Sequence, residues 1–258
     1  MAAQPYVLAV ALSYFAGQAV EKPVFEVATI KRSANLNDGG TSSWRPGGVF
    51  RAVNVPVRTL VMIAYETPQR ALLPTQVLDA PDWTVSDRYD VVAKVDPSVA
   101  ALPPPELFRK LPALMHSLLQ ERFKLKAHQE TRERPVFVVR IADSSGKLGP
   151  HLHASSTNCE AERSKCFIRF LPGHITAGAW AGDAMIRAVT ASLERVVIDK
   201  TGLTGKYDFD LEWSPDQTAT DKPSIFTALR EQLGLTIDSE RAPVEVLVID
   251  HIEKPTED

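Results

Sequence analysis

Two stretches of this sequence, one in each half, share the same order of apolar and charged residues. The first reads LLQERFKLKAHQETRERPVFVVRIA and contains Leu119; the second reads ALREQLGLTIDSERAPVEVLVIDHI and contains Leu229. Aligned pairs are Leu119 with Leu229, Glu121 with Glu231, Phe123 with Leu233, Leu125 with Leu235 and, after a two-residue gap, Pro135 with Pro243 and Val136 with Val244. An internal repeat constrains the fold most strongly, because it predicts two related units rather than one large one.

The similarity extends upstream of these stretches. DRYDVVAKV corresponds to GKYDFDLEW, which places Tyr89 on Tyr207 and Asp90 on Asp208. Further upstream, GGVFRAVNVPVRTLVMIAY corresponds to PGHITAGAWAGDAMIRAVT. The alternative explanation is that any two α/β segments share this apolar spacing. The conserved order of the segments favours duplication, with a structural motif made of Tyr89, Asp90, Thr201, Gly202, Gly205, Tyr207 and Asp208.

The chain length and charge narrow the possible classes. A chain of 258 residues can form one large domain or two small ones. Its hydrophobic content of 44% and charged content of 24% are ordinary for a globular protein. The net charge of −3 gives no basic footprint for nucleic acid, so we expect no nucleic-acid partner.

The periodicity predicts an α+β fold with two tandem pseudo-repeats. Each repeat is expected to be a small mixed sheet with two helices, in the order β-α-β-β-α-β-β. The expected divisions are an apolar leader over 1–22, a first repeat over 23–142, a junction loop with the cysteine pair over 143–172, and a second repeat over 173–258. Each repeat is expected to end in a hairpin. The first is formed by 123–128 and 136–141, joined by the charged turn QETRER, and the second by 235–239 with 244–249.

Several residues mark the expected ends of helices. Pro56 precedes a helix over VRTLVMIAYE, and Pro112 interrupts the helix expected over 106–121 unless a second segment starts near Leu111. Ser224 is a plausible N-cap, and Gly234 is a plausible residue just past the helix end.

The beginning of the chain resembles a secretory leader. Residues 6–19 read YVLAVALSYFAGQA, an apolar stretch too short to span a membrane and followed by small residues suited to cleavage. The preceding MAAQP has no basic residue, which departs from a typical leader; a short buried helix is the alternative. Export is therefore the expected localisation, periplasmic or extracellular.

The two cysteines, Cys159 and Cys166, stand close together in NCEAERSKCF. In an oxidising compartment this spacing suits one local disulfide, whereas in the cytosol they would be two free thiols. Their spacing fits neither a CxxC redox pair nor a structural zinc site.

No motif in the chain assigns a catalytic, metal-binding or cofactor-binding residue. His151 and His153 could share a metal on a strand, but no HExxH or carboxylate-rich partner accompanies them. Asp208, Asp210 and Glu212 alternate along one strand, and we interpret them as a polar outer face. The run from Thr201 to Gly205 lacks the lysine of a phosphate loop and is interpreted as a turn. We therefore predict no catalytic set, metal or cofactor.

Two resemblances to known families bear on the function. The combination of FEVATIK, DRYDVVAKV, LLQERFKLKAHQETRERPVF, VIDKTGLTGKYDFDLEW and APVEVLVIDHIEKP resembles a paralogue-rich family of exported proteins of unknown function from soil acidobacteria. Some members of that family resemble fusions to membrane metallopeptidase-like sensor proteins, which implies an extracytoplasmic setting and a sensing role. Each half also resembles, in element order, the short N-terminal domain of secretins and TonB-dependent receptors, a periplasmic interaction fold.

These observations predict an extracytoplasmic, non-catalytic interaction or sensing module. Its expected partner is an envelope protein or peptide, bound by addition of a strand to an exposed sheet edge, and it would meet the membrane only through an uncleaved leader. Residues 244–249 are expected to be central and buried, while 235–239 or 207–213 lie nearer an edge. The alternatives are an envelope hydrolase and a small-ligand binding protein, with a site between the two halves.

Overall fold

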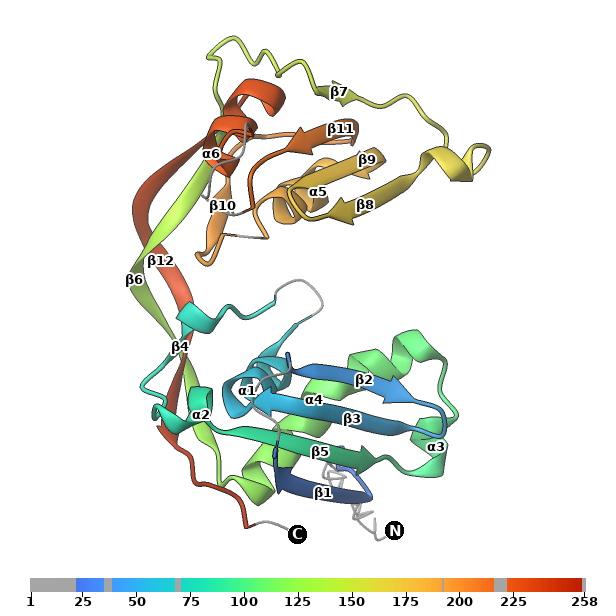
Figure 1. The fold of residues 1–258 in the computed structure, drawn as a ribbon, viewed down its shortest axis with the longest axis vertical. Coiled ribbons are helices and arrows are strands. Elements are labelled where there is room, and N and C mark those ends of the chain that lie inside the picture. The colour runs from blue at the N-terminus through green and yellow to red at the C-terminus, as the bar shows by residue number, and fades with distance from the viewer. Residues whose placement is uncertain (1–21, 35–38, 68–70, 192, 216–221, 257–258) are drawn as a thin grey trace, which may run out of the picture.

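The chain forms two lobes joined by a long two-stranded ribbon (Figure 1). The computed structural model describes residues 22–34, 39–67, 71–191, 193–215 and 222–256. We call residues 22–123 the first lobe and residues 142–234 the second lobe. The apolar stretch expected to be a leader lies outside the described residues.

The first lobe is a four-stranded antiparallel sheet with helices on its inner face. Its strands are β1 (Val27–Arg32), β2 (Thr41–Arg45), β3 (Val49–Pro56) and β5 (Arg88–Lys94), in the order β1-β5-β3-β2. Helices α1 (Val57–Tyr65) and α4 (Pro104–Arg122) pack on each other and on the sheet. Buried and exposed side chains alternate along β5, so one face of the sheet packs on the helices. Tyr89, Val91 and Ala93 are buried, whereas Val92 and Lys94 are exposed.

Short elements fill the connections of the first lobe. They are a 3₁₀ turn, η1 (Pro74–Gln76), followed by β4 (Val77–Leu78), α2 (Trp83–Ser86) and α3 (Pro97–Ala100). Helix α4 runs continuously through Pro112, so the expected interruption does not occur.

The second lobe repeats the strand order of the first. Its strands are β7 (Leu152–Ala154), β8 (Phe167–Leu171), β9 (His174–Ala181) and β11 (Lys206–Glu212), in the order β7-β11-β9-β8. The turn before β3 and the turn before β9 make the same hydrogen bond to the end of the neighbouring strand. Val95 N–H donates to Gly48 O at 3.0 Å, and Trp213 N–H donates to Gly173 O at 2.9 Å. Strands β7 and β8 of this sheet lie within residues 143–172, the segment expected to be a junction loop.

The longest helix of the second lobe has eight residues, whereas α4 of the first lobe has 19. The helices of the second lobe are η2 (Arg163–Lys165), α5 (Gly182–Val189), α6 (Ile225–Ala228) and a π-helical turn, η3 (Leu229–Leu233), with the short strand β10 (Val197–Asp199) between α5 and β11. The expected caps are confirmed: Ser224 Oγ accepts from Thr227 N–H at 3.2 Å, and Gly234 is left-handed with φ 70°.

The prediction of two hairpins is wrong. The residues of each expected hairpin form one continuous long strand. Strands β6 (Lys126–Ile141) and β12 (Leu235–His251) pair antiparallel along their whole length, from Leu235 opposite Ile141 to His251 opposite Lys126. The charged QETRER segment thus finds its backbone partners in β12 instead of turning. Pro135 and Pro243 fit here because β4 and β10 flank only short parts of β12 and β6.

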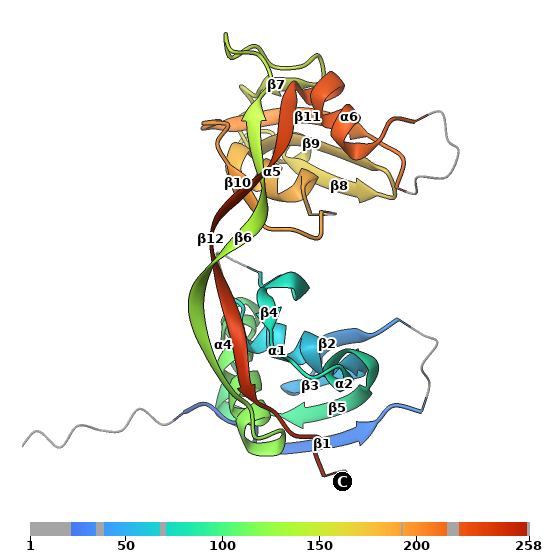
Figure 2. The same cartoon turned by 90° about the vertical axis from the view of Figure 1, so that its left-hand side faces the viewer.

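The ribbon exchanges strand ends between the lobes (Figure 2). The end of β12 places Leu247 and Ile249 in the core of the first lobe, together with Phe123. The end of β6 places Val139 in the core of the second lobe, beside Leu235. A third sheet, in the order β10-β6-β12-β4, joins the lobes, so each core is completed by a strand from the other half of the chain.

Candidate functional site

Tyr89 and Asp90 in β5 lie at the same place in their sheet as Tyr207 and Asp208 in β11. Both tyrosines are buried; Tyr89 packs edge-on against Phe123 at 5.8 Å between ring centroids, and Tyr207 Oη donates to Thr204 O at 3.2 Å. Each aspartate bonds a backbone N–H on the neighbouring strand, at an irregularity in the strand register. These contacts organise the two sheets at their register irregularities.

The segment from Thr201 to Gly205 is a turn. Asp199 Oδ1 accepts from Thr201 N–H at 2.8 Å and from Thr201 Oγ1 at 2.7 Å. Gly202 and Gly205 have φ values of 68° and 96°, which side-chain-bearing residues rarely adopt. Gly205 O in turn accepts from Gly182 N–H at the start of α5, so the turn anchors a helix.

The acidic residues of β11 lie on the outer face of the second sheet. Tyr207, Phe209 and Leu211 are buried, while the alternate residues are partly or fully exposed. His174 Nε2 lies 3.1 Å from Asp210 Oδ2, and His153 is opposite Asp208. Over the described parts of the chain, no three His, Cys, Asp or Glu side chains form a cluster suited to a metal ion.

Cys159 and Cys166 form a disulfide, with their Cα atoms 5.7 Å apart. The bond closes the loop that contains η2 and ends directly before Phe167, the first residue of β8. Gly178 in β9 lets this loop approach, because a Cβ at that position would collide with the Lys165 carbonyl. The disulfide therefore fixes the path of the chain into β8.

Strand β8 is an outer strand with an exposed apolar surface. It pairs with β9 on one side only, and no strand among the described residues pairs with its other side. Phe167 is 39% exposed, Phe170 58% and Leu171 53%. Because β8 exposes large apolar side chains on both faces, it presents an open template for another strand.

The first lobe shows how the same position is covered. Trp44 in β2 lies opposite Phe50, as Phe170 in β8 lies opposite Ile175. Trp44 packs against Phe25 and Phe50, at 6.5 and 5.7 Å between ring centroids, and against the small core of Val95, Leu107 and Leu114. Helix α4 has 19 residues, whereas α6 and η3 have only four and five. Among the described residues, the shorter helices leave the end of the second sheet uncovered at Phe170.

The sequence analysis expected the exposed sheet edge at 235–239 or 207–213 and did not identify β8. Strand β11, considered as a possible edge, is central between β7 and β9. Among the described strands, residues 235–239 of β12 pair only with β6, as an edge would. Residues 244–249 are buried except Glu245, as expected. The signal for β8 was present as FIRFL directly after Cys166, but it stood in the segment interpreted as a loop.

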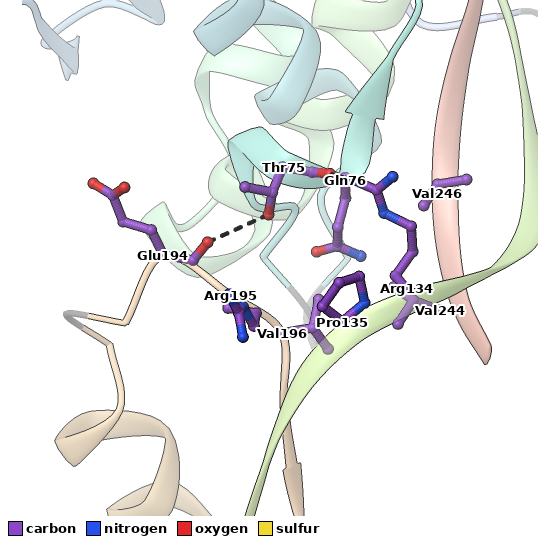
Figure 3. A pocket seen from close by; sticks show the side chains of 9 residues that line it. All are labelled: Thr75, Gln76, Arg134, Pro135, Glu194, Arg195, Val196, Val244 and Val246. Atoms are coloured by element: carbon purple, nitrogen blue, oxygen red, sulfur yellow. Dashed lines mark hydrogen bonds between the residues drawn. The ribbon is translucent and has the colours of Figure 1, made fainter. Parts of the chain in front are cut away.

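A cavity of about 230 Å³ lies where both lobes meet the ribbon (Figure 3). Thr75 and Gln76 of η1 line it from the first lobe, and Glu194 and Arg195 line it from the segment before β10. Arg134, Pro135, Val244 and Val246 of the ribbon complete it. Thr75 Oγ1 donates to Glu194 O at 3.5 Å and so connects the lobes across the cavity.

Comparison with known families gives one assignment. The family described as "Protein of unknown function (DUF3738)" matches residues 58–252. The chain belongs to this family. The DUF3738 match begins in α1 and ends just after β12, so it includes the ribbon and most of both lobes.

Searches among curated proteins and among solved structures gave no match. None of the described helices is long and apolar enough to cross a membrane.

Proposed function

We propose that this protein is an extracytoplasmic binding module, which takes up an extended segment of an envelope protein as an added strand along β8. The uncovered Phe170 carries the proposal, because the corresponding Trp44 is packed under other parts of the chain. A partner strand would cover Phe170 in the second lobe as Phe25 covers Trp44 in the first.

The side chains of β8 specify the chemistry of that segment. Phe167, Arg169 and Leu171 point to one face of the sheet, and Ile168 and Phe170 point to the other. The guanidinium of Arg169 lies over the Phe167 ring at 5.9 Å and forms no ion pair with any described residue. The preferred segment is therefore apolar on both faces, with an acidic residue placed to meet Arg169.

The disulfide supports both the docking site and the localisation. It holds the entry to β8 in one path, which lowers the conformational entropy lost when a partner strand binds. Disulfides persist in oxidising compartments and are rare in the cytosol. The cysteine pair and the apolar segment near the start of the chain therefore support export.

Crosslinking mass spectrometry on the protein in a native envelope tests this function. A photo-reactive residue in place of the exposed Leu171, with Arg169 intact, should capture a partner through an extended segment. The capture should be lost in a Phe167→Ser/Phe170→Ser variant. Phe108→Ser is the matched control, because Phe108 is 57% exposed on α4 and far from β8 in sequence and fold. A partner that binds the double variant and wild type equally would contradict strand addition at β8.

A second candidate function, binding of a small ligand between the halves, is favoured by the cavity at the ribbon. That cavity shares no lining residue with β8, so the two functions can be tested separately.

A further inference from the structure

The outer face of the first sheet, opposite α1 and α4, carries two rows of side chains that cross all four strands. The register of the strands places Arg45, Val49, Lys94 and Val27 in one row and Arg51 beside Val92 in the next. The ends of the second row are a serine of β2 and a threonine of β1. We call Val27, Arg45, Val49, Arg51, Val92 and Lys94 the basic face. All of them except Val49 are exposed.

Cations and valines are interspersed in the basic face. Lys94 lies between Val27 and Val49, and Arg51 lies opposite Val92. Val27 is 59% exposed and Val92 is 43% exposed. Because side chains opposite each other on neighbouring strands stand about 5 Å apart, three positive charges share one patch with exposed apolar side chains.

No carboxylate compensates these charges. Among the residues that the structure describes, none of the three cations forms an ion pair. The nearest carboxylates along the chain from Lys94 are Asp90 and Asp96, which accept hydrogen bonds from the N–H groups of Asn54 and Ser98, each at 2.8 Å. Glu26, which precedes β1, lines a cavity against α4 on the helix side of the sheet. The basic face is therefore a local excess of positive charge.

The duplicated sheet shows that the fold does not require a basic outer face. In the alignment of the two halves, Val92 corresponds to Asp210 and Lys94 to Glu212. Both sheets have the same strand order, yet the second carries acidic residues at these positions. The whole chain also has a net charge of −3, so the basic face contrasts with the rest of the molecule. Its charge indicates an anionic partner.

The composition of the basic face favours a lipid surface as that partner. Its side chains stand in rows on a sheet, whereas the cavities between α1 and α4 and beside the segment before β1 are lined by other residues. It contains no Trp, Tyr or Phe, although aromatic side chains anchor many protein interfaces. Interspersed cations and aliphatic side chains suit the headgroup region of a membrane, which presents phosphates next to an apolar boundary.

We propose that the basic face docks on a membrane surface that contains anionic lipids. Arg45, Arg51 and Lys94 would bind lipid phosphates, and Val27 and Val92 would enter the boundary between the headgroups and the acyl chains. The basic face belongs to the first lobe and shares no residue with β8. Lipid binding is therefore independent of the proposed strand addition and can be tested separately.

Flotation of the full chain with lipid vesicles tests the proposal. The probes are vesicles of phosphatidylcholine alone and of phosphatidylcholine mixed with phosphatidylglycerol. We expect flotation with the mixed vesicles at low salt, and its loss as salt is added, because a screening length of about 10 Å at 0.1 M salt weakens exposed charge pairs. The apolar stretch at 6–19 is present in every variant, so differences between variants report on the basic face.

The charge variants compare two sets of exposed cations. Arg45→Gln/Arg51→Gln/Lys94→Gln should weaken binding to the mixed vesicles about a hundredfold, because each cation next to an anionic surface contributes about fivefold. Arg109→Gln/Lys110→Gln/Lys147→Gln is the matched control. It changes the net charge equally at exposed positions outside the basic face, and it should bind nearly as the wild type does.

The valine variants test entry into the lipid. Val27→Ser/Val92→Ser should weaken binding several-fold, whereas Val85→Ser, at a valine 45% exposed on α2, should not. Equal flotation with both kinds of vesicle, or equal binding by the wild type and the folded triple variant of the basic face, would overturn the proposal. Tighter binding of soluble polyglutamate than of the mixed vesicles would also overturn it and assign an acidic protein partner instead.

Discussion

Asp208 Oδ1 accepts a hydrogen bond from the backbone N–H of Ala179 at 2.7 Å, across neighbouring strands of the second sheet. The first sheet contains the same arrangement, in which Asp90 Oδ1 accepts from Asn54 N–H at 2.8 Å. Both donors have a left-handed backbone, with φ 52° at Ala179 and 56° at Asn54. Asparagine adopts this conformation more readily than alanine, so the second sheet holds the less favourable residue.

Ala179→Gly should therefore stabilise the protein. Glycine removes the steric cost of the left-handed backbone, about 1–2 kcal/mol, which exceeds its own entropic cost of roughly 0.5–1 kcal/mol. Urea unfolding should show a rise of up to about 1 kcal/mol in the free energy of unfolding. Asn54→Gly is the matched control and should show a smaller gain; a destabilised Ala179→Gly variant would contradict the reasoning.

Asp208→Ala should lower the stability of the second lobe. The substitution leaves the Ala179 N–H without its acceptor, and a buried unsatisfied donor costs about 1–3 kcal/mol. Hydrogen exchange of the Ala179 amide should become faster in this variant while amides of β3 in the first sheet keep their rates. Unchanged exchange at Ala179 would show that solvent replaces the carboxylate.

Leu247→Ala tests the strand exchange. Leu247 lies in the second half of the sequence, but its side chain is 1% exposed in the core of the first lobe. We expect a loss of about 2–5 kcal/mol, the usual cost of Leu→Ala in a core. Faster hydrogen exchange should appear first in β5 and α1. If the loss were confined to α5 and β9, the strand exchange would be refuted.

Cys159→Ser/Cys166→Ser should destabilise the protein by about 2–3 kcal/mol, because the disulfide closes a short loop and restricts the unfolded chain. The reduced wild type should behave like the variant in thermal unfolding. The proposed docking edge adds a second expectation: partner capture at β8 should weaken even at temperatures where the variant is fully folded.

Because of Asp87, the free energy of unfolding should depend on pH in the acid range. Lys254 Nζ lies 2.7 Å from Oδ2 and Arg32 Nη2 3.0 Å from Oδ1, and these cations, Lys254 first, hold the pKa of Asp87 below its ordinary value. A depressed pKa stabilises the fold above the unfolded pKa of about 3.9, and this contribution is lost as the pH falls through the folded pKa. Asp87→Asn should flatten the stability curve of urea unfolding in that acid range; an unchanged curve would exclude Asp87 as the group responsible.

The local elements of this fold were predictable because their signals lie within a few residues. Ser224, Gly234 and the alternation along β11 each gave the correct local structure. The close spacing of Cys159 and Cys166 gave the correct pairing. In each case the physical cause is a capping hydrogen bond, a backbone preference or a short loop, and none requires knowledge of distant partners.

The long ribbon could not be read in the same way. QETRER is charged and was interpreted as a turn, yet it contains no Gly, Pro, Asn or Asp that would favour one. Its extended form depends on β12, which begins about a hundred residues later. The inter-lobe cavity was anticipated as a location, but its lining residues come from η1, the ribbon and the segment before β10, and no local pattern marks any of them.

The exchange of strand ends also bears on protein synthesis. The lobe that leaves the ribosome first is completed by β12, which is made last, since Leu247 and Ile249 belong to its core. Until those residues emerge, Leu60 and Phe123 lack part of their apolar surroundings. Folding of the first lobe should therefore finish only after translation of β12, and a nascent chain stalled before residue 247 should remain sensitive to protease in the first lobe.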